Sequence, residues 1–126
     1  MAKIGYCEKC GEYAVIELHH IVFKSQCKIL KDCELNHKYL CGECHRGSER
    51  GVHLNSKIDK RMKLELQEKL FELFPDEKVS LDEVKKVLKL KDKEIYYIYK
   101  NLYMLDGKVK SEDLVRRLMG GKLIIE

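Results

Sequence analysis

Four cysteines in two identical pairs are the residues whose type and spacing most directly indicate chemistry. They occur as Cys7-x-x-Cys10 and Cys41-x-x-Cys44. A Cys-x-x-Cys turn places two thiolates on one side of a tight loop, which suits one edge of a tetrahedral zinc site. Two such turns predict a closed structural site, because four cysteine ligands leave no position for water. The alternative is four unrelated thiols, although paired spacing of this kind rarely arises by accident.

The cellular compartment of the protein affects how the two remaining cysteines are interpreted. The N-terminal segment MAKIGYCEKC lacks the apolar stretch of a secretory signal, and no long apolar run occurs. We therefore expect a cytoplasmic protein without a membrane span. In a reducing compartment, cysteines are more often metal ligands or free thiols than disulfides. Cys27 and Cys33 lack the paired spacing, so we interpret them as free thiols, with a second role such as an alternative ligand left open.

Histidines lie between and just after the cysteine pairs. His19 and His20 are adjacent, Asn36 precedes the second pair, and His45 and His53 follow it. A histidine with a pKa near neutral can deprotonate a water molecule, and a divalent metal bound nearby can act as a Lewis acid. Two adjacent histidines at a strand end point in opposite directions, so one can bind metal while its neighbour faces water. Taken singly, they would be surface histidines, and Asn36 a turn residue.

These motifs together resemble a known family. The order Cys-x-x-Cys, His-His-Ile, Asn-x-x-x-Leu-Cys-x-x-Cys-His over residues 7–74 is similar to the HNH endonucleases, especially small phage-type members. The resemblance implies a ββα-metal fold and a catalytic divalent metal, Mg²⁺, Mn²⁺, Ni²⁺ or Zn²⁺, held by His19 and His45. It implies His20 as the general base, and Asn36 as the residue that orients the base or ties down its loop.

The last ligand of that metal falls on one of two residues. Many members carry it four residues after the equivalent of His45, which is Glu49 here, whereas the next histidine is His53. Gly47 and Gly51 indicate a loop rather than a regular helix between them, so we favour His53 over Glu49. His37 fits no position of the motif, and we expect it to be exposed.

The elements that must position these residues divide the sequence in two. Every cysteine and histidine lies within residues 1–53, where turn residues dominate and the apolar run from Tyr13 to Leu18 predicts a strand. Residues 54–74 then predict a long helix, which Pro75 ends. One face of that helix repeats every fourth residue: Leu54, Ile58, Met62, Leu66, Leu70 and Phe74.

Residues 76–126 predict three short helices and a hairpin. Capping and turn residues mark their ends: a Ser80–Glu83 capping box, Asp92 and Ser111 as N-caps, Asp106-Gly107 as a hairpin turn and Gly120-Gly121 as a stop. Residues 122–125 are compatible with a terminal strand. This order is similar to the winged helix-turn-helix of MerR or excisionase-like DNA-binding modules.

Such modules place their second helix, here Lys93 to Tyr103, in the major groove. The side chains that would reach DNA are Lys91, Lys93 and Lys100, with Tyr96, Tyr97 and Tyr99. The alternative is a helical unit that covers the N-terminal part or mediates dimerisation, with half-buried tyrosines.

The composition and net charge of the chain are compatible with these expectations. The 126 residues are 37% charged and 44% hydrophobic, and a net charge of +4 permits nucleic acid without requiring it. We expect an α+β fold: a zinc-stapled ββα-metal core and its helix in residues 1–74, and a helical domain in residues 76–126. The expected function is metal-dependent DNA cleavage. The alternative is a non-catalytic zinc-containing DNA-binding protein of phage or mobile-element origin, which would have no use for His19, His20 and Asn36 together.

Overall fold

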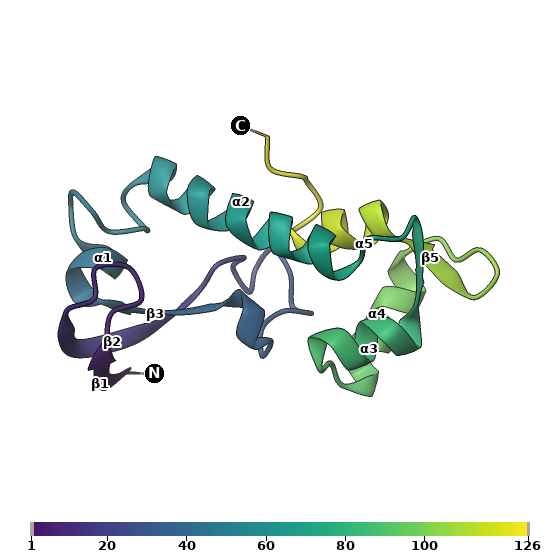
Figure 1. Cartoon of the computed structure of the whole chain (residues 1–126), viewed down its shortest axis with the longest axis horizontal. Coiled ribbons are helices and arrows are strands. Elements are labelled where there is room, and N and C mark those ends of the chain that lie inside the picture. Colours follow the sequence, from purple (N-terminus) through teal and green to yellow (C-terminus); the bar gives the residue numbers. More distant parts are fainter. Residues whose placement is uncertain (1, 126) are drawn as a thin grey trace.

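The computed structural model describes residues 2–125 and combines helices with strands, as the sequence predicts. This part of the chain contains five α-helices and two small antiparallel sheets. Figure 1 shows a three-stranded sheet at one end of the molecule and a group of short helices at the other. The longest helix, α2 (Ser56–Leu73), runs between these two ends.

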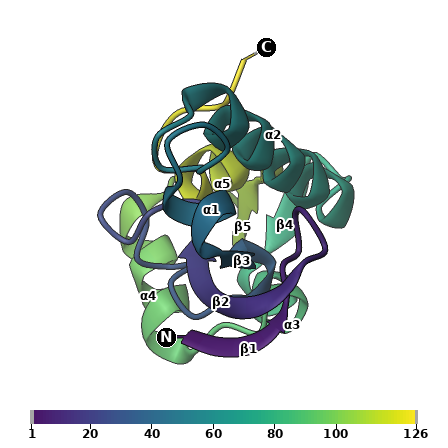
Figure 2. The ribbon, with the colours of Figure 1, turned by 90° about the vertical axis from the view of Figure 1, so that its left-hand side faces the viewer.

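The three-stranded sheet consists of β1 (Ala2–Tyr6), β2 (Tyr13–His20) and β3 (His37–Cys41) in that order. Figure 2 looks onto the end of the molecule that carries it, with α1 (Gly42–Arg46) beside it. The predicted strand over residues 13–18 is confirmed and continues to His20. It is longer because its last residues pair with β3, where His20 lies opposite His37.

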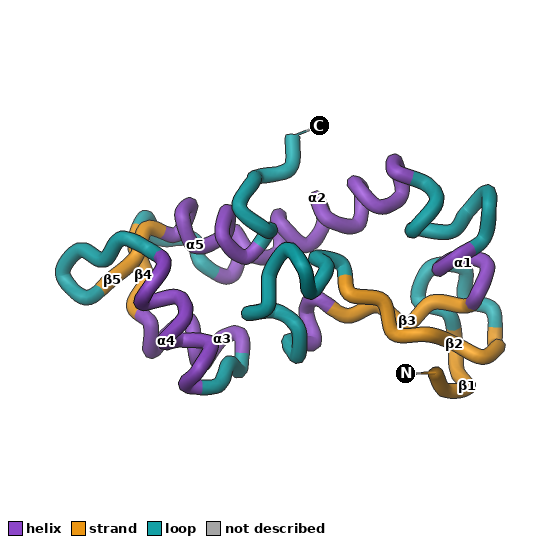
Figure 3. Tube along the Cα trace, turned by 180° about the vertical axis from the view of Figure 1, so that it is seen from behind, coloured by secondary structure: helices purple, strands orange, loops and turns teal. Residues whose placement is uncertain are grey.

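A loop of residues 21–33, followed by the 3-10 helix η1 (Glu34–Asn36), connects β2 to β3. We call residues 21–33 the β2–β3 loop. It lies in the middle of the molecule, between the sheet and the C-terminal helices, as Figure 3 shows. Ile29 and Leu30 are buried, whereas Lys28 and Lys31 on either side of them are exposed, so the loop has one face in the core and one in solvent.

Helix α2 confirms the predicted long helix with slightly different ends. Asn55 is its N-cap, since its side chain accepts hydrogen bonds from the backbone N–H groups of Lys57 and Ile58. Leu54 therefore precedes the helix and is 66% exposed, contrary to its predicted place on the apolar face. The rest of that face packs inward, with Ile58 partly buried and the following members buried: Met62, Leu66, Leu70 and Phe74.

The C-terminal part follows the predicted order of elements. Strand β4 (Lys78–Ser80) leads into α3 (Leu81–Leu88) and α4 (Asp92–Asn101), and then into β5 (Lys108–Lys110) and α5 (Ser111–Leu118). Strands β4 and β5 pair as a two-stranded sheet. The predicted N-cap at Ser80 is present, because its side chain accepts from the backbone N–H of Glu83. The Asp106-Gly107 turn is also confirmed, with positive φ at both residues.

Three predicted ends in this part are wrong. Lys91 rather than Asp92 is the N-cap of α4, and its backbone N–H donates to the side chain of Glu94. Lys110 is the N-cap of α5, because the hydroxyl of Ser111 donates instead to the backbone carbonyl of Asp76. Helix α4 ends at Asn101, two residues before the predicted Tyr103.

Residues 122–125 do not form the predicted strand. They are held by a side chain instead. The amide of Gln67 in α2 donates to the carbonyl of Ile124 at 3.0 Å and accepts from its N–H at 2.7 Å. These two hydrogen bonds occupy the backbone N–H and carbonyl of Ile124, which a neighbouring strand would otherwise bind.

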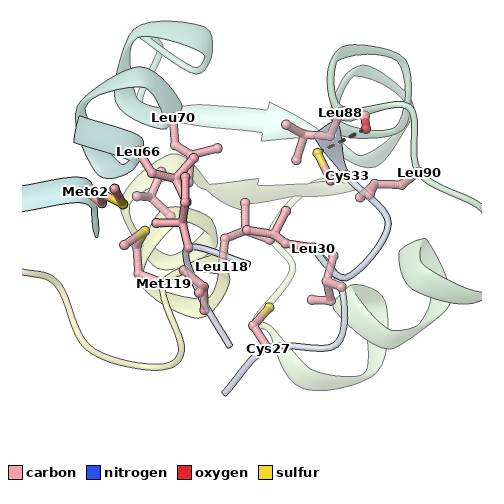
Figure 4. Close-up of a cluster of buried hydrophobic side chains, with 14 of the residues drawn as sticks. Cys27, Leu30, Cys33, Met62, Leu66, Leu70, Leu88, Leu90, Leu118 and Met119 are labelled. Carbon is pink, nitrogen blue, oxygen red and sulfur yellow. Dashed lines mark hydrogen bonds between the residues drawn. The ribbon is translucent and has the colours of Figure 1, made fainter. Parts of the chain in front are cut away.

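One hydrophobic core extends across the predicted boundary at Pro75. Figure 4 shows side chains from four elements in contact there, with the thiol of Cys33 donating to the carbonyl of Leu88 at 3.6 Å. The contributors come from the β2–β3 loop, α2, the α3 end and α5: Cys27, Leu30, Cys33, Met62, Leu66, Leu70, Leu88, Leu90, Leu118 and Met119. The C-terminal helices therefore cover both α2 and the loop that follows β2.

Within residues 2–125, no helix has the length and apolar character needed to cross a membrane.

Candidate metal centres and the histidine cluster

The four paired cysteines come together as predicted. Cys7 and Cys10 lie in the turn between β1 and β2, Cys41 ends β3, and Cys44 lies in α1. Their sulfur atoms all lie within 4.8 Å of one another, and those of Cys10 and Cys41 are 3.8 Å apart. A tetrahedral zinc with Zn–S bonds of about 2.3 Å separates its sulfurs by about 3.8 Å. The cluster can therefore hold a structural zinc ion.

The backbone around this cluster favours a thiolate. Burial raises the pKa of Cys7, but backbone N–H groups of Cys10, Cys41 and Lys9 outweigh it and bring this pKa to about 6. Burial and the neighbouring thiols raise the pKa of Cys44 to about 12. Four thiolates in one small volume repel one another, so full ionisation of the cluster requires a bound cation.

Cys27 and Cys33 stand apart from the cluster. Both are buried in the hydrophobic core, and burial raises the pKa of each thiol. Neither forms a disulfide. Their surroundings match the predicted free thiols, and their side chains serve as small apolar groups in the core.

Three histidines form a second cluster on the inner side of β2. His19 comes from β2, His45 from α1 and His53 from the segment before α2, and one ring nitrogen of each lies within 4.8 Å of the others. The Nε2 atoms of His45 and His53 are 2.9 Å apart. Metal–imidazole bonds of about 2.0–2.1 Å place two ligand nitrogens about 2.9–3.4 Å apart at bond angles of 90–109°. Glu49 is exposed and does not belong to this cluster.

The buried member of this cluster has an unused ring atom. His19 is 2% exposed, and its Nε2 has no hydrogen-bond partner. Burial, followed by the proximity of His53 and His45, lowers the pKa of His19 to about 3. A neutral imidazole with a free buried nitrogen has the form that a metal requires.

Glu17 orients His45 from the same strand as His19. The Nδ1 of His45 donates to the Glu17 carboxylate at 2.7 Å, and Arg46 donates to the same carboxylate at 2.6 and 2.9 Å. The Arg46 guanidinium, and after it His45, hold the pKa of Glu17 at about 2. Glu17 therefore stays ionised and fixes the proton of His45 on Nδ1, so the Nε2 lone pair points into the cluster, where it accepts from the Nε2 of His53 at 2.9 Å.

A tight glycine loop returns His53 to His45. The backbone N–H of Gly51 donates to the carbonyl of Gly47, and the N–H of His53 donates to the carbonyl of His45. A Cβ atom at Gly51 would lie 2.3 Å from the backbone of Gly47, so no larger residue fits there. The predicted loop between the two glycines is confirmed, and it accounts for a histidine eight residues after His45.

His20 lies on the opposite face of β2 from this cluster. Its Nε2 donates to the backbone carbonyl of Lys31 at 3.0 Å, and the Nε2 of His37 donates to the same carbonyl at 2.8 Å. The two rings are 5.0 Å apart between centroids. Burial lowers the pKa of His20. His37, expected to be exposed, is half-buried against His20.

Asn36 is fully buried and ties down the β2–β3 loop. Its side-chain oxygen accepts from the N–H of Val22 at 2.7 Å. Its side-chain nitrogen donates to the carbonyls of Val22 and Leu30 at 3.0 and 3.3 Å. Of the two roles that the resemblance implies for Asn36, these contacts correspond to holding the loop.

The lysines proposed for DNA lie on or beside α4. Lys93 is exposed next to Tyr97. The ammonium of Lys100 lies 5.6 Å from the ring centre of Tyr96, and Lys91 precedes the first turn. The tyrosines Tyr96, Tyr97 and Tyr99 are exposed rather than buried in the core.

Sequence reasoning did not assign a role to two residues beside the histidine cluster. Phe23 packs against His19 and His53, with ring centroids 6.1 and 5.6 Å apart. Lys63 of α2 lies over the Phe23 ring at 4.5 Å and pairs with Asp59 at 3.0 Å. The position of Phe23, two residues after the His-His-Ile motif, was a local signal for its place beside the histidines. Lys63 had no such signal, because its contact depends on how α2 packs in the tertiary fold.

Comparison of the chain with models of protein families, with curated proteins and with solved structures finds no match.

Proposed function

We propose that this chain is a metal-dependent endonuclease of the HNH type that hydrolyses phosphodiester bonds of DNA. The observation that carries the proposal is the convergence of His19, His45 and His53 beside an ionised Glu17. Structural zinc sites use four protein ligands, whereas catalytic sites use three and leave a position open. The same chain offers both kinds, with four cysteines in one cluster and three histidines in the other.

The donor set fits a divalent metal. The Nε2 of His19, which has no hydrogen-bond partner, and the unprotonated Nε2 of His45 are neutral nitrogen ligands for a metal. Imidazole suits Zn²⁺ and Ni²⁺ better than it suits Mg²⁺. We therefore expect Zn²⁺ and Ni²⁺ to bind this cluster more tightly than Mg²⁺. A divalent metal bound there would supply Lewis-acid stabilisation of the phosphate and of the leaving oxygen.

The chain's own residues supply the remaining roles. In this proposal His20 accepts the proton of the attacking water. Its Nε2 carries a hydrogen, because it donates to the carbonyl of Lys31, so Nδ1 holds the lone pair that can act as the base. A lowered pKa keeps this ring neutral at neutral pH. Asn36 keeps the loop behind His20 in place.

The DNA substrate and the C-terminal reader are parts of the same proposal. The HNH resemblance supports DNA, and Lys91, Lys93 and Lys100 support contacts from α4. The order of α3, α4 and the β5 hairpin is compatible with a winged helix-turn-helix, which belongs to the proposal and not to the described fold.

A plasmid-cleavage assay with Mg²⁺, Mn²⁺, Ni²⁺ or Zn²⁺ tests the function. We expect the wild-type chain to cut and His20→Ala to lose on the order of 10²–10⁴-fold in rate. His37→Ala is the matched control, because His37 donates to the same carbonyl on the same face and should keep most activity.

The alternative of a non-catalytic zinc-containing DNA-binding protein makes the opposite forecast. It expects no cleavage with any of the four metals, even when the purified chain binds DNA. Equal rates for wild type and His20→Ala would retain the nuclease but remove His20 as its base.

A further inference from the structure

A cleft of about 460 Å³ lies where the β2–β3 loop meets α4. Three lysines of the loop, Lys24, Lys28 and Lys31, and Lys93 of α4 line it. We call this the lysine cleft. Two carboxylates, those of Asp32 and Glu94, also line it, so positive charge is in excess. The Glu94 carboxylate is additionally engaged by the backbone N–H of Lys91 at 2.7 Å.

The lysines of this cleft are free to bind an anion. All four are exposed, and within residues 2–125 none of them belongs to an ion pair. Some cations elsewhere are engaged by acids: Lys63 pairs with Asp59, and Arg116 pairs with Glu112 and Asp113. Other exposed lysines, such as Lys86 and Lys108, are unpaired too, so the cleft differs from them by gathering four lysines around one concavity. Four unpaired cations around one concavity raise the local concentration of anions.

The walls of the cleft are held by the core. Between the lysines, the loop buries Cys27 and Leu30 against Leu118 and Met119, as Figure 4 shows. On the other wall, Arg117 donates to the hydroxyl of Tyr97 at 2.7 Å. Two parts of the sequence about 60 residues apart therefore form one fixed surface.

The lysine cleft adjoins the residue proposed as the base. The backbone carbonyl of Lys31 accepts the hydrogen bonds of His20 and His37. The side chain before Lys24, that of Phe23, packs on His19 and His53. The loop thus connects the cleft with both faces of the proposed site.

We propose that the lysine cleft binds consecutive phosphates of the DNA strand that is cut and directs that strand toward His20. The proposal rests on the proposed function and deepens it. The C-terminal part then contributes to substrate binding through Lys93 at a composite surface, rather than through α4 alone. Contacts of this kind fix the position of the strand and carry no sequence information.

DNA affinity of the full zinc-loaded chain tests the proposal. The chain carries one equivalent of zinc, for the cysteine cluster alone. The probe is a fluorescently labelled duplex, measured by anisotropy at several salt concentrations without any other divalent metal. Lys28→Ala with Lys93→Ala should lower affinity on the order of ten-fold or more at about 0.1 M salt. It should also reduce the log–log salt slope by about 1.8, because two phosphate contacts are lost.

The control pair is Lys86→Ala with Lys108→Ala, which removes the same charge from exposed lysines outside the cleft. It should change affinity by less than about two-fold, since neither lysine contacts a phosphate in this proposal. Lys28→Arg with Lys93→Arg should retain wild-type affinity. Equal losses in both alanine pairs, or no binding by the wild-type chain, overturn the proposal.

This test and the cleavage assay fail separately. If the alanine pair in the cleft loses affinity but the wild-type chain does not cut DNA with any of the four metals, the DNA-binding cleft is supported and the nuclease proposal is wrong. If His20-dependent cleavage occurs and the alanine pair in the cleft binds normally, the nuclease stands and the cleft falls.

Discussion

Glu17 and His19 lie two residues apart on β2, so their side chains leave the same face of the strand. This spacing brings a carboxylate next to the histidine cluster, where it accepts the Nδ1 proton of His45. Carboxylates in this position raise the basicity of a metal-binding histidine and fix its orientation. Glu17 therefore prepares the cluster without itself belonging to it.

Glu17→Gln should weaken metal binding at the histidine cluster by on the order of 10–100-fold. The amide keeps the size of the side chain but loses the charge that holds His45 and Arg46. Titration with Ni²⁺ after the cysteine cluster is filled with zinc measures this affinity. Glu12→Gln is the control, because Glu12 is an exposed acid that pairs with Arg50 at 3.8 Å and has no contact with the histidine cluster among the described hydrogen bonds and ion pairs. Unchanged Ni²⁺ affinity in Glu17→Gln would count against a metal site at these histidines.

The residues of the two clusters were predictable to different depths. Local spacing was enough to predict the cysteine cluster and the separation of His19 from His20 across a strand. The role of Glu17 was not predicted, because it depends on His45 and Arg46, which are 28 and 29 residues away in sequence. His37 was also missed, since its contact with His20 requires the β2–β3 register.

Among the elements, the β2–β3 loop has the greatest need for a specific anchor. It has little regular structure of its own, yet it carries Phe23 to the histidine cluster and three lysines to the cleft. Asn36 supplies three hydrogen bonds to its backbone inside the core. A buried amide in this position substitutes for the strand partner that the loop lacks.

Asn36→Ala should lower the free energy of unfolding by on the order of 3 kcal/mol, because buried backbone groups left unpaired cost about 1–3 kcal/mol each. The groups concerned are the N–H of Val22 and the carbonyls of Val22 and Leu30. Urea denaturation of the zinc-loaded chain measures the change. Asn101→Ala removes an exposed hydrogen bond to Tyr97 and should cost less than about 1 kcal/mol. A similar small loss at Asn36 would show that the loop is anchored elsewhere.

Element prediction succeeded where local sequence determines the outcome. The four-residue repeat predicted α2, and positive φ at Asp106 and Gly107 follows from the turn preference of that pair. It failed at ends that tertiary contacts decide. Ser111 was predicted as a cap, but its hydroxyl bonds Asp76 across the β4–β5 sheet, and the strand expected after α5 is replaced by hydrogen bonds to Gln67.

At the scale of the whole molecule, the two sequence regions share one core. The apolar face of α2 packs on one side of the β2–β3 loop, and α5 packs against both. The predicted boundary at Pro75 marks a change of sequence pattern, while the core continues across it. This arrangement favours covering of the N-terminal part as one role of residues 76–126, and the proposed binding of DNA at the lysine cleft would be a second role.

Truncation after Phe74 should therefore leave a chain that unfolds or aggregates. It would uncover Met62, Leu66 and Leu70 of α2, together with Leu30 of the loop. Full burial of one such side chain contributes about 1.5–3 kcal/mol. A whole domain is stable by only about 5–15 kcal/mol, so uncovering several such side chains removes a free energy comparable with the whole stability.

Near-UV circular dichroism and binding of a hydrophobic dye to the zinc-loaded fragment measure this outcome. A chain ending at Gly121 is the matched control, because it keeps α5 and the core and loses the hydrogen bonds between Gln67 and Ile124. It should remain folded, with a smaller loss of stability. A folded, monomeric fragment 1–74 that still cuts DNA would show instead that the histidine cluster needs no cover. The C-terminal helices would then contribute only to substrate binding, because the β2–β3 loop would keep its structure without them.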